Sequence, residues 1–593
     1  MAHSCASSGL NCCKGKRHGS KQKAEGSKQH PRGIANDKRI KHWNWFFTDC
    51  LLPTAYCLLT LVSMSKTFYV TTPLYYVNAA PHIGHSYTNI AADCLARYHR
   101  LKGEEVFLLT GTDEHGQKIE QAAKDAGLQP KAFVDQVVER FKALWQLLGI
   151  SYDDFIRTTE ARHVRVVQAC LSRLHDEDKL LHATYQGWYC TPCETFWTTD
   201  ELAARPGGAS PVCPNCQRPL EAVNEEGWHL PLRQAQDWLR NFVRDHRTFI
   251  QPQTRYNEIA SLLDQPLPEY LCITRPRQRV GWGIPVPFSE QHVTYVWFDA
   301  LINYITVPGF GQDQARFSTL WPADVHLIGK DILRHHAIYW PIVLHALGLP
   351  DEAMPRMIFA HGWWKVGEQK MSKSLGNIVD PTVVITQLLK GQPHAADVYR
   401  YFLLREIPFG QDGTFSEEAL MKRLESDLAN DLGNLVHRTV SMIARYCQGK
   451  VPAPGPVGCA VDDEPLRQEA LSLAARLDDA MQVLNFAQAL EVIFQLVTHA
   501  NRYIEVQAPW QLATTSSPTR LHTVLFVLTE IIRIVAISLE PFMPATSAAI
   551  WEQLGLGRTP RRLADTSRWA QLQAGQPLGK RDVLFPRSQT VAS

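Results

Sequence analysis

The sequence has almost no surplus of charge of either sign. Its 593 residues carry 61 Lys and Arg against 59 Asp and Glu, a formal net charge of +2. Ten of the basic residues but only three of the acidic ones fall within residues 1–63, so the rest of the chain has a net charge of about −5. This balance excludes a broad basic field of the kind that coats nucleic acid, and any nucleic-acid partner must be met by local patches.

Long apolar runs and a disulfide framework are also lacking. The run Trp45–Val62 is interrupted by Asp49 and Pro53 and lies far from Met1, which argues against a spanning helix and a secretory signal. We therefore expect no membrane partner. Four of the 14 cysteines form two CxxC pairs, a pattern typical of metal binding in a reducing compartment, so we expect a cytoplasmic protein.

Residues 1–63 are rich in Lys, Ser, Gly, His and Cys and show no periodicity. We expect a disordered tail, or a misassigned start upstream of the true initiator Met64. The alternative is a presequence, which would place the protein in the mitochondrial matrix. The bias toward Lys over Arg and the lack of an amphipathic pattern disfavour that alternative.

From Thr67 onward the chain alternates strand and helix patterns. TFYVTT, a helix from Ser86 to Lys102 ended by Gly103, and EVFLLTGTD predict a βαβ unit of a parallel sheet. A second such half follows in VHLIGKD, the helix 332–347 and RMIFAHG. We therefore predict an α/β fold with a split, doubly wound, Rossmann-like nucleotide-binding domain, interrupted by an insertion of roughly 180 residues.

Behind this domain the pattern changes to long amphipathic helices without strands, for example at 417–446, 465–483 and 487–508. We predict that an all-α helical bundle closes the chain. The expected divisions are 64–183 for the first catalytic half, 184–225 for a zinc-binding connective knuckle, 226–390 for the connective remainder and the second catalytic half, and 391–593 for the bundle.

The two CxxC pairs predict one structural zinc ion per chain. They supply Cys190, Cys193, Cys213 and Cys216, and 19 residues separate the second cysteine from the third. This spacing lies within the window expected for a four-cysteine zinc site. Four thiolates close the coordination sphere and leave no position for a reacting water. Four free thiols are the alternative.

A phosphate site is indicated by His82-Ile83-Gly84-His85, which stands between a predicted strand and the start of a helix. Free backbone N–H groups and the helix dipole favour phosphate there. Gly84 lets a nucleotide approach the backbone, and the two imidazoles can donate hydrogen bonds to phosphate oxygens. Ordinary capping histidines are the alternative for so short a string.

A second motif, Lys370-Met371-Ser372-Lys373-Ser374, is followed by Leu375-Gly376-Asn377. Its two lysines and two hydroxyls can neutralise charge that develops on a departing pyrophosphate. A solvated surface loop would be the alternative if the motif stood alone.

Together, the two motifs on opposite halves of one fold resemble the HIGH and KMSKS signatures of class I aminoacyl-tRNA synthetases. The chain is similar to the methionyl-tRNA synthetase family from about Lys66 almost to its end, through TTPLYYVNAAPHIGH, GTDEHG, TTEARH, GWYCTPCETF, WGIPVP, YVWFDALINY, IGKDILRHHAIYWP, KMSKSLGN and PFGQDG. The resemblance implies that methionine reacts with ATP to give methionyl-adenylate and pyrophosphate and is then transferred to tRNA(Met). Mg²⁺ would accompany ATP.

The resemblance also implies the site residues. His82, His85, Lys370 and Lys373 would be catalytic and would bind ATP together with Gly84 and Ser374. The methionine pocket would consist of Leu74, Tyr76, Trp297, Ala300, Tyr304, Ile332 and His336, with Asp113 pairing with the substrate ammonium. A thioether suits such an aromatic and aliphatic pocket, while the positive amine needs a carboxylate. Hydrophobic core is the alternative for each aromatic residue.

Three further acidic or basic residues have open roles. Asp299 and Asp331 have the same sort of location as Asp113, and they are structural as readily as ligand-binding. Arg275 could serve tRNA or substrate phosphate.

In the bundle, Trp510 would stack on an anticodon base, with Asn430 and Arg438 facing the anticodon. Helix-terminal packing is the alternative for Trp510. Because the bundle is followed only by LFPRSQTVAS, we expect no dimerising domain of the kind some family members carry, and therefore a monomer.

Two other functions stay open. A class I synthetase for another large apolar amino acid would need a longer insertion to hold a large editing domain. A catalytically idle RNA-binding or scaffold protein would not need both motifs and Asp113 intact.

Overall fold

The computed structural model describes residues 67–203, 211–367, 369–370, 378–455, 463–514, 518–557 and 559–587. The expected tail at 1–63 and the expected initiator Met64 lie outside these residues.

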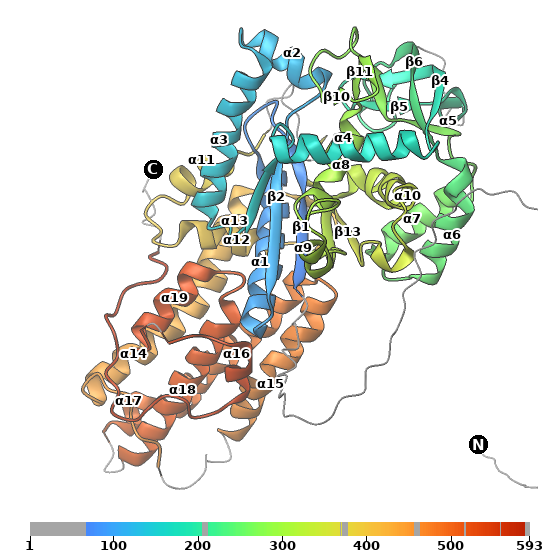
Figure 1. Ribbon diagram of the computed structural model, residues 1–593. Helices are drawn as coiled ribbons and strands as arrows, with labels where there is room; N and C mark the ends of the chain where they lie inside the picture. The colour runs from blue at the N-terminus through green and yellow to red at the C-terminus, as the bar shows by residue number, and fades with distance from the viewer. Residues whose placement is uncertain are drawn as a thin grey trace, which may run out of the picture. The chain divides into compact units, whose positions relative to one another are not determined.

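A six-stranded parallel sheet forms the centre of the nucleotide-binding domain (Figure 1). Its strands, in spatial order, are β3 (Asp154–Arg157), β2 (Val106–Asp113), β1 (Phe68–Tyr76), β12 (Val325–Gly329), β13 (Ile358–His361) and β7 (Ile250–Gln251). The strands β1 and β12 lie side by side, with Val70 opposite Val325, although they come from distant parts of the sequence. The predicted split, doubly wound domain is therefore confirmed, and its strand order reverses between these two strands.

Successive residues of the strands enter two different hydrophobic cores. Val70 and Leu108 pack on one face of the sheet, while Tyr69 and Leu109 pack on the other. The first face is covered by α1 (Ile83–Lys102), α3 (Pro130–Leu148) and α12 (Ala395–Arg405). The second is covered by α4 (Ala161–Asp176), α8 (Val296–Thr306) and α10 (Trp340–Ala346). Burial of both faces explains the nearly continuous apolar runs in these strands.

The insertion contains two small antiparallel sheets. One has the order β5-β4-β6-β8, with β4 (Leu181–Cys190), β5 (Thr195–Trp197), β6 (Glu221–Pro231) and β8 (Tyr270–Cys272). The other consists of β9 (Thr274–Pro276), β10 (Pro285–Val286) and β11 (Ser289–Thr294). Between β6 and β8 the chain passes through α6 (Gln236–Asp245), β7 and α7 (Gln253–Leu263), and β7 joins the main sheet beside β13. The insertion is therefore not continuous, because β7 within it belongs to the central sheet.

Long helices form the C-terminal bundle, as predicted. They are α13 (Glu417–Arg423), α14 (Asn434–Tyr446), α15 (Glu464–Gln482), α16 (Phe486–Gln507), α18 (Pro518–Leu539) and α19 (Pro544–Gln553). A π-helical segment, Leu424–Gly433, joins α13 to α14. The helix α18 is long and apolar enough to cross a membrane, but 94% of its apolar window is buried inside the protein, as in the core helix of a bundle.

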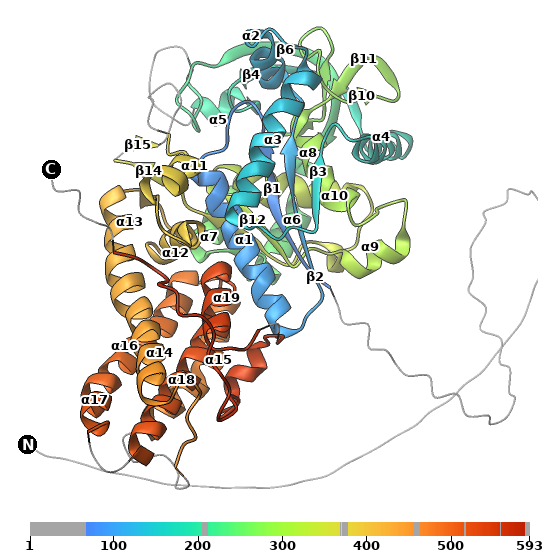
Figure 2. The same cartoon turned by 90° about the vertical axis from the view of Figure 1, so that its left-hand side faces the viewer.

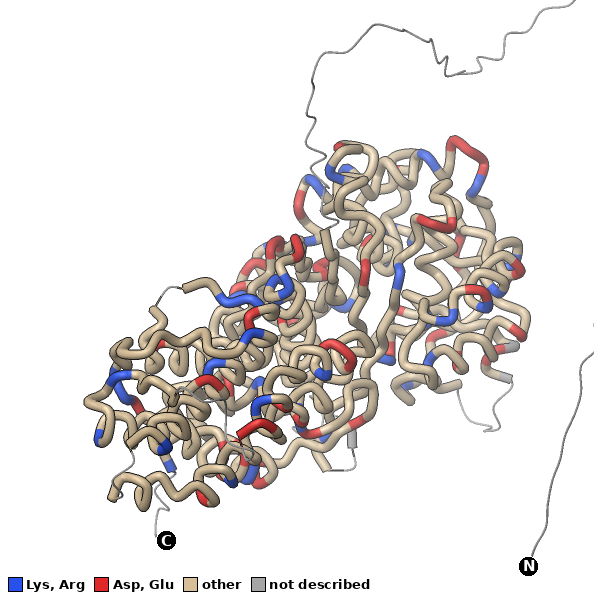
Figure 3. Tube along the Cα trace, turned by 90° about the horizontal axis from the view of Figure 1, so that it is seen from below, with Lys and Arg blue, Asp and Glu red and all other residues tan. Residues whose placement is uncertain are grey.

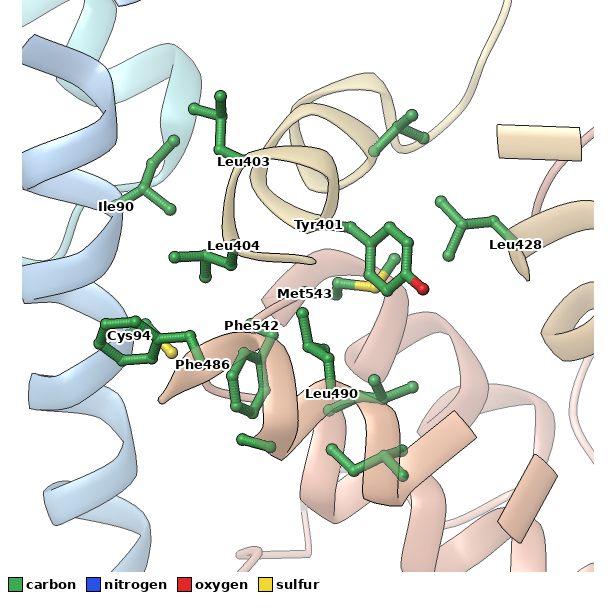
Figure 4. Close-up of a cluster of buried hydrophobic side chains, with 14 of the residues drawn as sticks. Ile90, Cys94, Tyr401, Leu403, Leu404, Leu428, Phe486, Leu490, Phe542 and Met543 are labelled. Carbon is green, nitrogen blue, oxygen red and sulfur yellow. The ribbon is translucent and has the colours of Figure 1, made fainter. Parts of the chain in front are cut away.

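The bundle and the nucleotide-binding domain share one hydrophobic core. Figure 4 shows Ile90 and Cys94 of α1 facing Leu404 of α12 and Phe486 of α16. Beside this core the fully buried Arg400 pairs with Asp93 of α1 at 2.7 Å. Its other donors reach the carbonyls of Pro541 and Phe542, so one guanidinium connects the two parts of the molecule.

Figure 2 shows α14, α16 and α18 of the bundle below the sheet. Acidic and basic residues are interspersed along the traced part of the chain (Figure 3). This distribution agrees with the absence of a broad basic field over the described residues.

Candidate active site

A cavity of about 280 Å³ opens at the carboxyl ends of β1 and β12, where the strand order reverses. This edge of a doubly wound sheet is where ligands collect. All of the residues assigned to the methionine pocket line this cavity, namely Leu74, Tyr76, Asp113, Trp297, Ala300, Tyr304, Ile332 and His336. His82, Gly84 and His85 of the first signature line it as well. The structure therefore brings together residues that lie more than 260 positions apart in the sequence.

The first signature folds into a reciprocal helix cap. His82 precedes α1 and accepts a hydrogen bond from the Gly84 amide at Nδ1 over 3.1 Å, while Nδ1 of His85 accepts one from the His82 amide over 3.1 Å. The two rings stack with centroids 3.9 Å apart. Because each Nδ1 is an acceptor, the proton of each neutral ring is on Nε2. The capping role is therefore compatible with an N–H donor at Nε2.

Glycine at position 84 leaves room for this cap. A Cβ there would lie 3.0 Å from Cε1 and 3.1 Å from Nδ1 of His82, which is closer than ordinary contact. A Cβ at this position would thus press against the imidazole that caps the helix.

Asp113 ends β2 and is only 3% exposed. Its Oδ1 has no hydrogen-bond partner among the described residues. Burial, reinforced by the negative charges of Asp299 and Glu194, raises the pKa of this carboxyl well above its usual range. A carboxylate oxygen that is buried without a hydrogen-bond partner costs free energy. In an aromatic cavity such an oxygen is therefore a site for a cationic donor.

Aromatic side chains across the cavity from Asp113 are held by hydrogen bonds and ring stacking. Nδ1 of His336 donates to the Ile332 carbonyl at 2.9 Å, so Nε2 accepts the hydroxyl proton of Tyr304, also at 2.9 Å. Burial lowers the pKa of His336 to about 4, which keeps the ring neutral at pH 7. The ring of Trp297 stacks on His335 with centroids 3.8 Å apart. A π-helical turn, His335–Tyr339, carries both histidines, and such turns are frequent at functional sites.

Asp299 and Asp331 take different positions. Asp299 is fully buried and accepts hydrogen bonds from His115 at 2.7 Å and His163 at 2.8 Å. Burial alone would raise its pKa, but these two histidines lower it below the usual value. Asp299 is therefore structural, whereas Asp331 lines the cavity and accepts from the Trp363 indole at 3.0 Å.

The second signature is described only at its edges. Lys370 ends β15 (Gln369–Lys370), whose partner β14 (Trp364–Val366) carries Trp364 in the cavity wall. Residues 371–377, which include Lys373 and Ser374, lie outside the described residues. The Val379 carbonyl, just beyond them, accepts a hydrogen bond from the Ile83 amide at 3.1 Å. The chain just after the second signature thus lies beside the first signature.

The four cysteines of the insertion form one cluster, with all Sγ atoms within 4.8 Å of one another. The Sγ atoms of Cys190 and Cys216 are 3.5 Å apart, and those of Cys193 and Cys213 are 4.0 Å apart. Four sulfurs at zinc–sulfur bond lengths in a tetrahedron are about 3.8 Å apart, so the set fits a four-coordinate metal.

Sequence reasoning missed several residues of the site. Thr88 and His361 line the cavity and hydrogen-bond to each other at 2.7 Å. Glu194, next to Cys193, accepts a hydrogen bond from the Tyr76 hydroxyl. No local pattern distinguished these three, although each lies in or beside a motif that the sequence analysis quoted.

Arg275 does not take the role considered for it. The residue is 2% exposed, and its side chain makes two hydrogen bonds to Glu225, at 2.8 and 3.0 Å. Its guanidinium also lies 4.1 Å from the centre of the Tyr189 ring. Since Glu225 neutralises it inside the insertion, Arg275 is core structure rather than a phosphate contact.

In the bundle, Trp510 lies in α17 (Pro509–Leu512) and is 40% exposed. The Arg438 guanidinium lies 5.7 Å from the centre of its ring and pairs with Glu505 at 2.6 Å. Asn430 accepts a hydrogen bond from Arg587 at 3.1 Å. The structure therefore joins Trp510 to Arg438 by a direct contact, and Asn430 has a separate partner.

Comparisons with known proteins agree with this geometry. The family described as tRNA synthetases class I (M) matches residues 68–440. The family described as anticodon binding domain of methionyl tRNA ligase matches residues 451–590, which include Trp510.

Individual relatives match most of the chain. It is 45% identical to a methionine–tRNA ligase of Clostridium acetobutylicum over 538 residues, covering 89% of this chain and 79% of the relative. It is 41% identical to that of Thermotoga maritima over 520 residues, covering 88% and 80%. A Mycobacterium tuberculosis methionyl-tRNA synthetase in complex with methionyl-adenylate superposes with a TM-score of 0.83, at 39% identity, over 88% of this chain and 100% of that one. The chain therefore belongs to the methionyl-tRNA synthetase family of class I aminoacyl-tRNA synthetases.

Proposed function

We propose a division of roles among the cavity residues in the methionine–tRNA ligase reaction. A carboxylate oxygen of methionine attacks the α-phosphorus of ATP, the bond to the bridging oxygen breaks, and pyrophosphate leaves. A hydroxyl of the terminal adenosine of tRNA(Met) then attacks the activated carbonyl, and AMP leaves. No side chain becomes covalently attached, so rate enhancement comes from positioning and charge stabilisation.

The observation that carries this assignment is Oδ1 of Asp113, which lies in an aromatic cavity without a hydrogen-bond partner among the described residues. The substrate ammonium supplies the missing donor, and pairing with it offsets the desolvation of the carboxylate. The methionine side chain lies against Leu74, Trp297, Ala300, Tyr304 and Ile332. The neutral ring of His336 adds no charge beside the thioether, which favours an apolar substrate.

ATP binds at the start of α1. The Nε2–H donors of His82 and His85 and the helix dipole favour its phosphates, and Gly84 leaves room for them. By family resemblance, Lys370, Lys373 and Ser374 stabilise the charge on the departing pyrophosphate. Mg²⁺ accompanies ATP as part of the substrate.

The cysteine cluster holds a structural zinc ion through Cys190, Cys193, Cys213 and Cys216. The support is the near-tetrahedral spacing of four thiols, two of them buried. When bound, the metal supplies folding energy to the knuckle and takes no part in the reaction.

The bundle recognises the anticodon, with Trp510 as the stacking platform and Arg438 beside it. Asn430, which pairs with Arg587, is a further candidate contact. An exposed indole next to a guanidinium is typical of contacts to unpaired bases. One chain supplies every residue of the cavity, so the proposal needs only a monomer, which analytical ultracentrifugation would test. We place the reaction in the cytoplasm, because a four-thiol site needs a reducing compartment, and imaging of the tagged protein would separate this from the mitochondrial matrix.

ATP–pyrophosphate exchange, measured with each proteinogenic amino acid in turn, tests the proposed function. We expect exchange that depends on methionine, followed by methionylation of tRNA(Met). Exchange supported by a different amino acid, or no exchange with any, would overturn it.

A further inference from the structure

We infer that Glu194 is a positioning residue that links the cysteine knuckle to Tyr76 in the wall of the cavity. The inference rests on the proposed function, since it concerns how the same cavity holds methionine. Glu194 directly follows Cys193, and its side chain reaches out of the knuckle into the catalytic domain. It is only 1% exposed.

Three groups from the catalytic domain hold Glu194. Its Oε2 accepts a hydrogen bond from the Tyr76 hydroxyl. Its Oε1 accepts one from the Lys118 amide at 3.0 Å, in the first turn of α2 (Gln117–Asp125). Its main-chain carbonyl accepts one from the Tyr295 hydroxyl. Because both carboxylate oxygens and the carbonyl are engaged, the residue has a single position in the fold.

The knuckle turn determines where this carboxylate lies. Glu194 has a φ of 49°, in the left-handed region that ordinary residues adopt at a cost of roughly 1 kcal/mol. Its amide donates to the Thr191 carbonyl at 3.3 Å, within the turn that contains Cys190 and Cys193. A change in that turn would therefore move the carboxylate away from Tyr76.

The catalytic domain is shaped to receive the carboxylate. Gly116 has a φ of 102°, and a Cβ at this position would lie 2.6 Å from Oε1 of Glu194. The Lys118 ammonium lies over the Tyr76 ring, 5.1 Å from its centre. Tyr76 is thus fixed by a hydrogen bond at its hydroxyl and a cation at its face.

Loss of the carboxylate would free the Tyr76 ring on the side of the cavity that holds methionine. We expect Glu194→Ala to raise the methionine KM in ATP–pyrophosphate exchange roughly tenfold or more, the scale of one hydrogen bond to a buried charge. The ATP KM and the metal content should stay near those of the unmodified protein. Glu194→Gln keeps an acceptor oxygen and should give a smaller rise.

A double-mutant cycle distinguishes loss of the hydrogen bond between Glu194 and Tyr76 from a general disruption of the fold. The effects of Glu194→Ala and Tyr76→Phe on the methionine KM should not add, because both remove the same hydrogen bond. Glu221→Ala is the matched control. Glu221 accepts from the Thr191 hydroxyl at 2.8 Å on the exposed side of the same turn, so its loss should leave both KM values unchanged.

An unchanged methionine KM in Glu194→Ala, an equal rise in the ATP KM, or additive effects with Tyr76→Phe would overturn the inference. If Glu194→Ala loses its metal, the cycle is run with Glu194→Gln and judged by the same outcomes. Methionine-dependent exchange by the unmodified protein is measured first, so that failure of the proposed function is distinguished from failure of the inference.

Discussion

The hydroxyl of Tyr304 donates a hydrogen bond to Nε2 of His336 over 2.9 Å inside the cavity. Burial lowers the pKa of His336 to about 4, against about 6.5 in an unfolded chain. As pH falls between these values, the unfolded state takes up a proton that the folded state does not, so stability is lost. Above the unfolded pKa this contribution is constant, and below about 4 the loss is complete.

We therefore expect the stability of His336→Gln to rise relative to that of the unmodified protein as pH falls from 7.5 to 5. Glutamine can make both hydrogen bonds of the ring but cannot titrate. The full loss that His336 causes is roughly 3 kcal/mol, most of it within this window. Thermal melting of both proteins at each pH measures it, and a constant difference in Tm would contradict a depressed pKa at His336.

Asp113→Asn should raise the methionine KM at least thirtyfold, because truncating a buried charge pair costs about 2–5 kcal/mol. The ATP KM should change little. Asp324→Asn is a suitable control, since Asp324 lies at the opposite edge of the sheet, where it accepts from the Tyr69 amide. If Asp113→Asn binds methionine normally, Asp113 does not hold the ammonium.

The double substitution of Cys213 and Cys216 by Ser should release the metal and weaken aminoacylation. The knuckle has its own small core, separate from that of the bundle, so the helical circular dichroism should persist. Cys170→Ser, at a buried thiol of α4, is the control and should retain the metal. Elemental analysis of the unmodified protein should find about one zinc per chain. A value near zero would remove the zinc assignment.

Trp510→Ala should reduce charging of tRNA(Met) by about 1–3 kcal/mol while sparing ATP–pyrophosphate exchange. The reason is that the indole lies in the bundle, whereas the cavity lies at the sheet. Val483→Ala removes another exposed side chain of the bundle, 65% exposed, and should affect neither activity. An equal loss of exchange in Trp510→Ala would show that the indole is packing core.

Breaking the buried pair between Arg400 and Asp93 should destabilise the junction of the two domains. Arg400→Met leaves Asp93 with Arg97 and Ser151 but removes a fully buried partner, at a cost of roughly 3–5 kcal/mol. Arg405→Met, at the end of the same helix, is the control. Thermal melting should show a lower Tm only for Arg400→Met.

The sequence by itself determined the elements whose signal is local. The strand, helix and strand that begin at Phe68 follow from periodicity and from Gly103, which ends α1 in the left-handed conformation at a φ of 88°. The spacing of the four cysteines gave the metal set, because ligand geometry limits how far apart in sequence such pairs lie. The cavity residues came from the resemblance to a known family. Sequence pattern alone does not distinguish an aromatic residue that lines a cavity from one that packs in the core.

Tertiary structure alone decided the relationships between distant residues. The strand β7 has two residues, too few for any periodicity, yet it completes the sheet beside β13. The pairing of Arg275 with Glu225, 50 residues earlier, buries a guanidinium that the sequence alone leaves open to a phosphate. Glu194 meets Tyr76 across 118 residues. Contacts of this kind depend on which side chains the packed elements bring together, and burial then determines the charge, the hydrogen bonds and the pKa of each group.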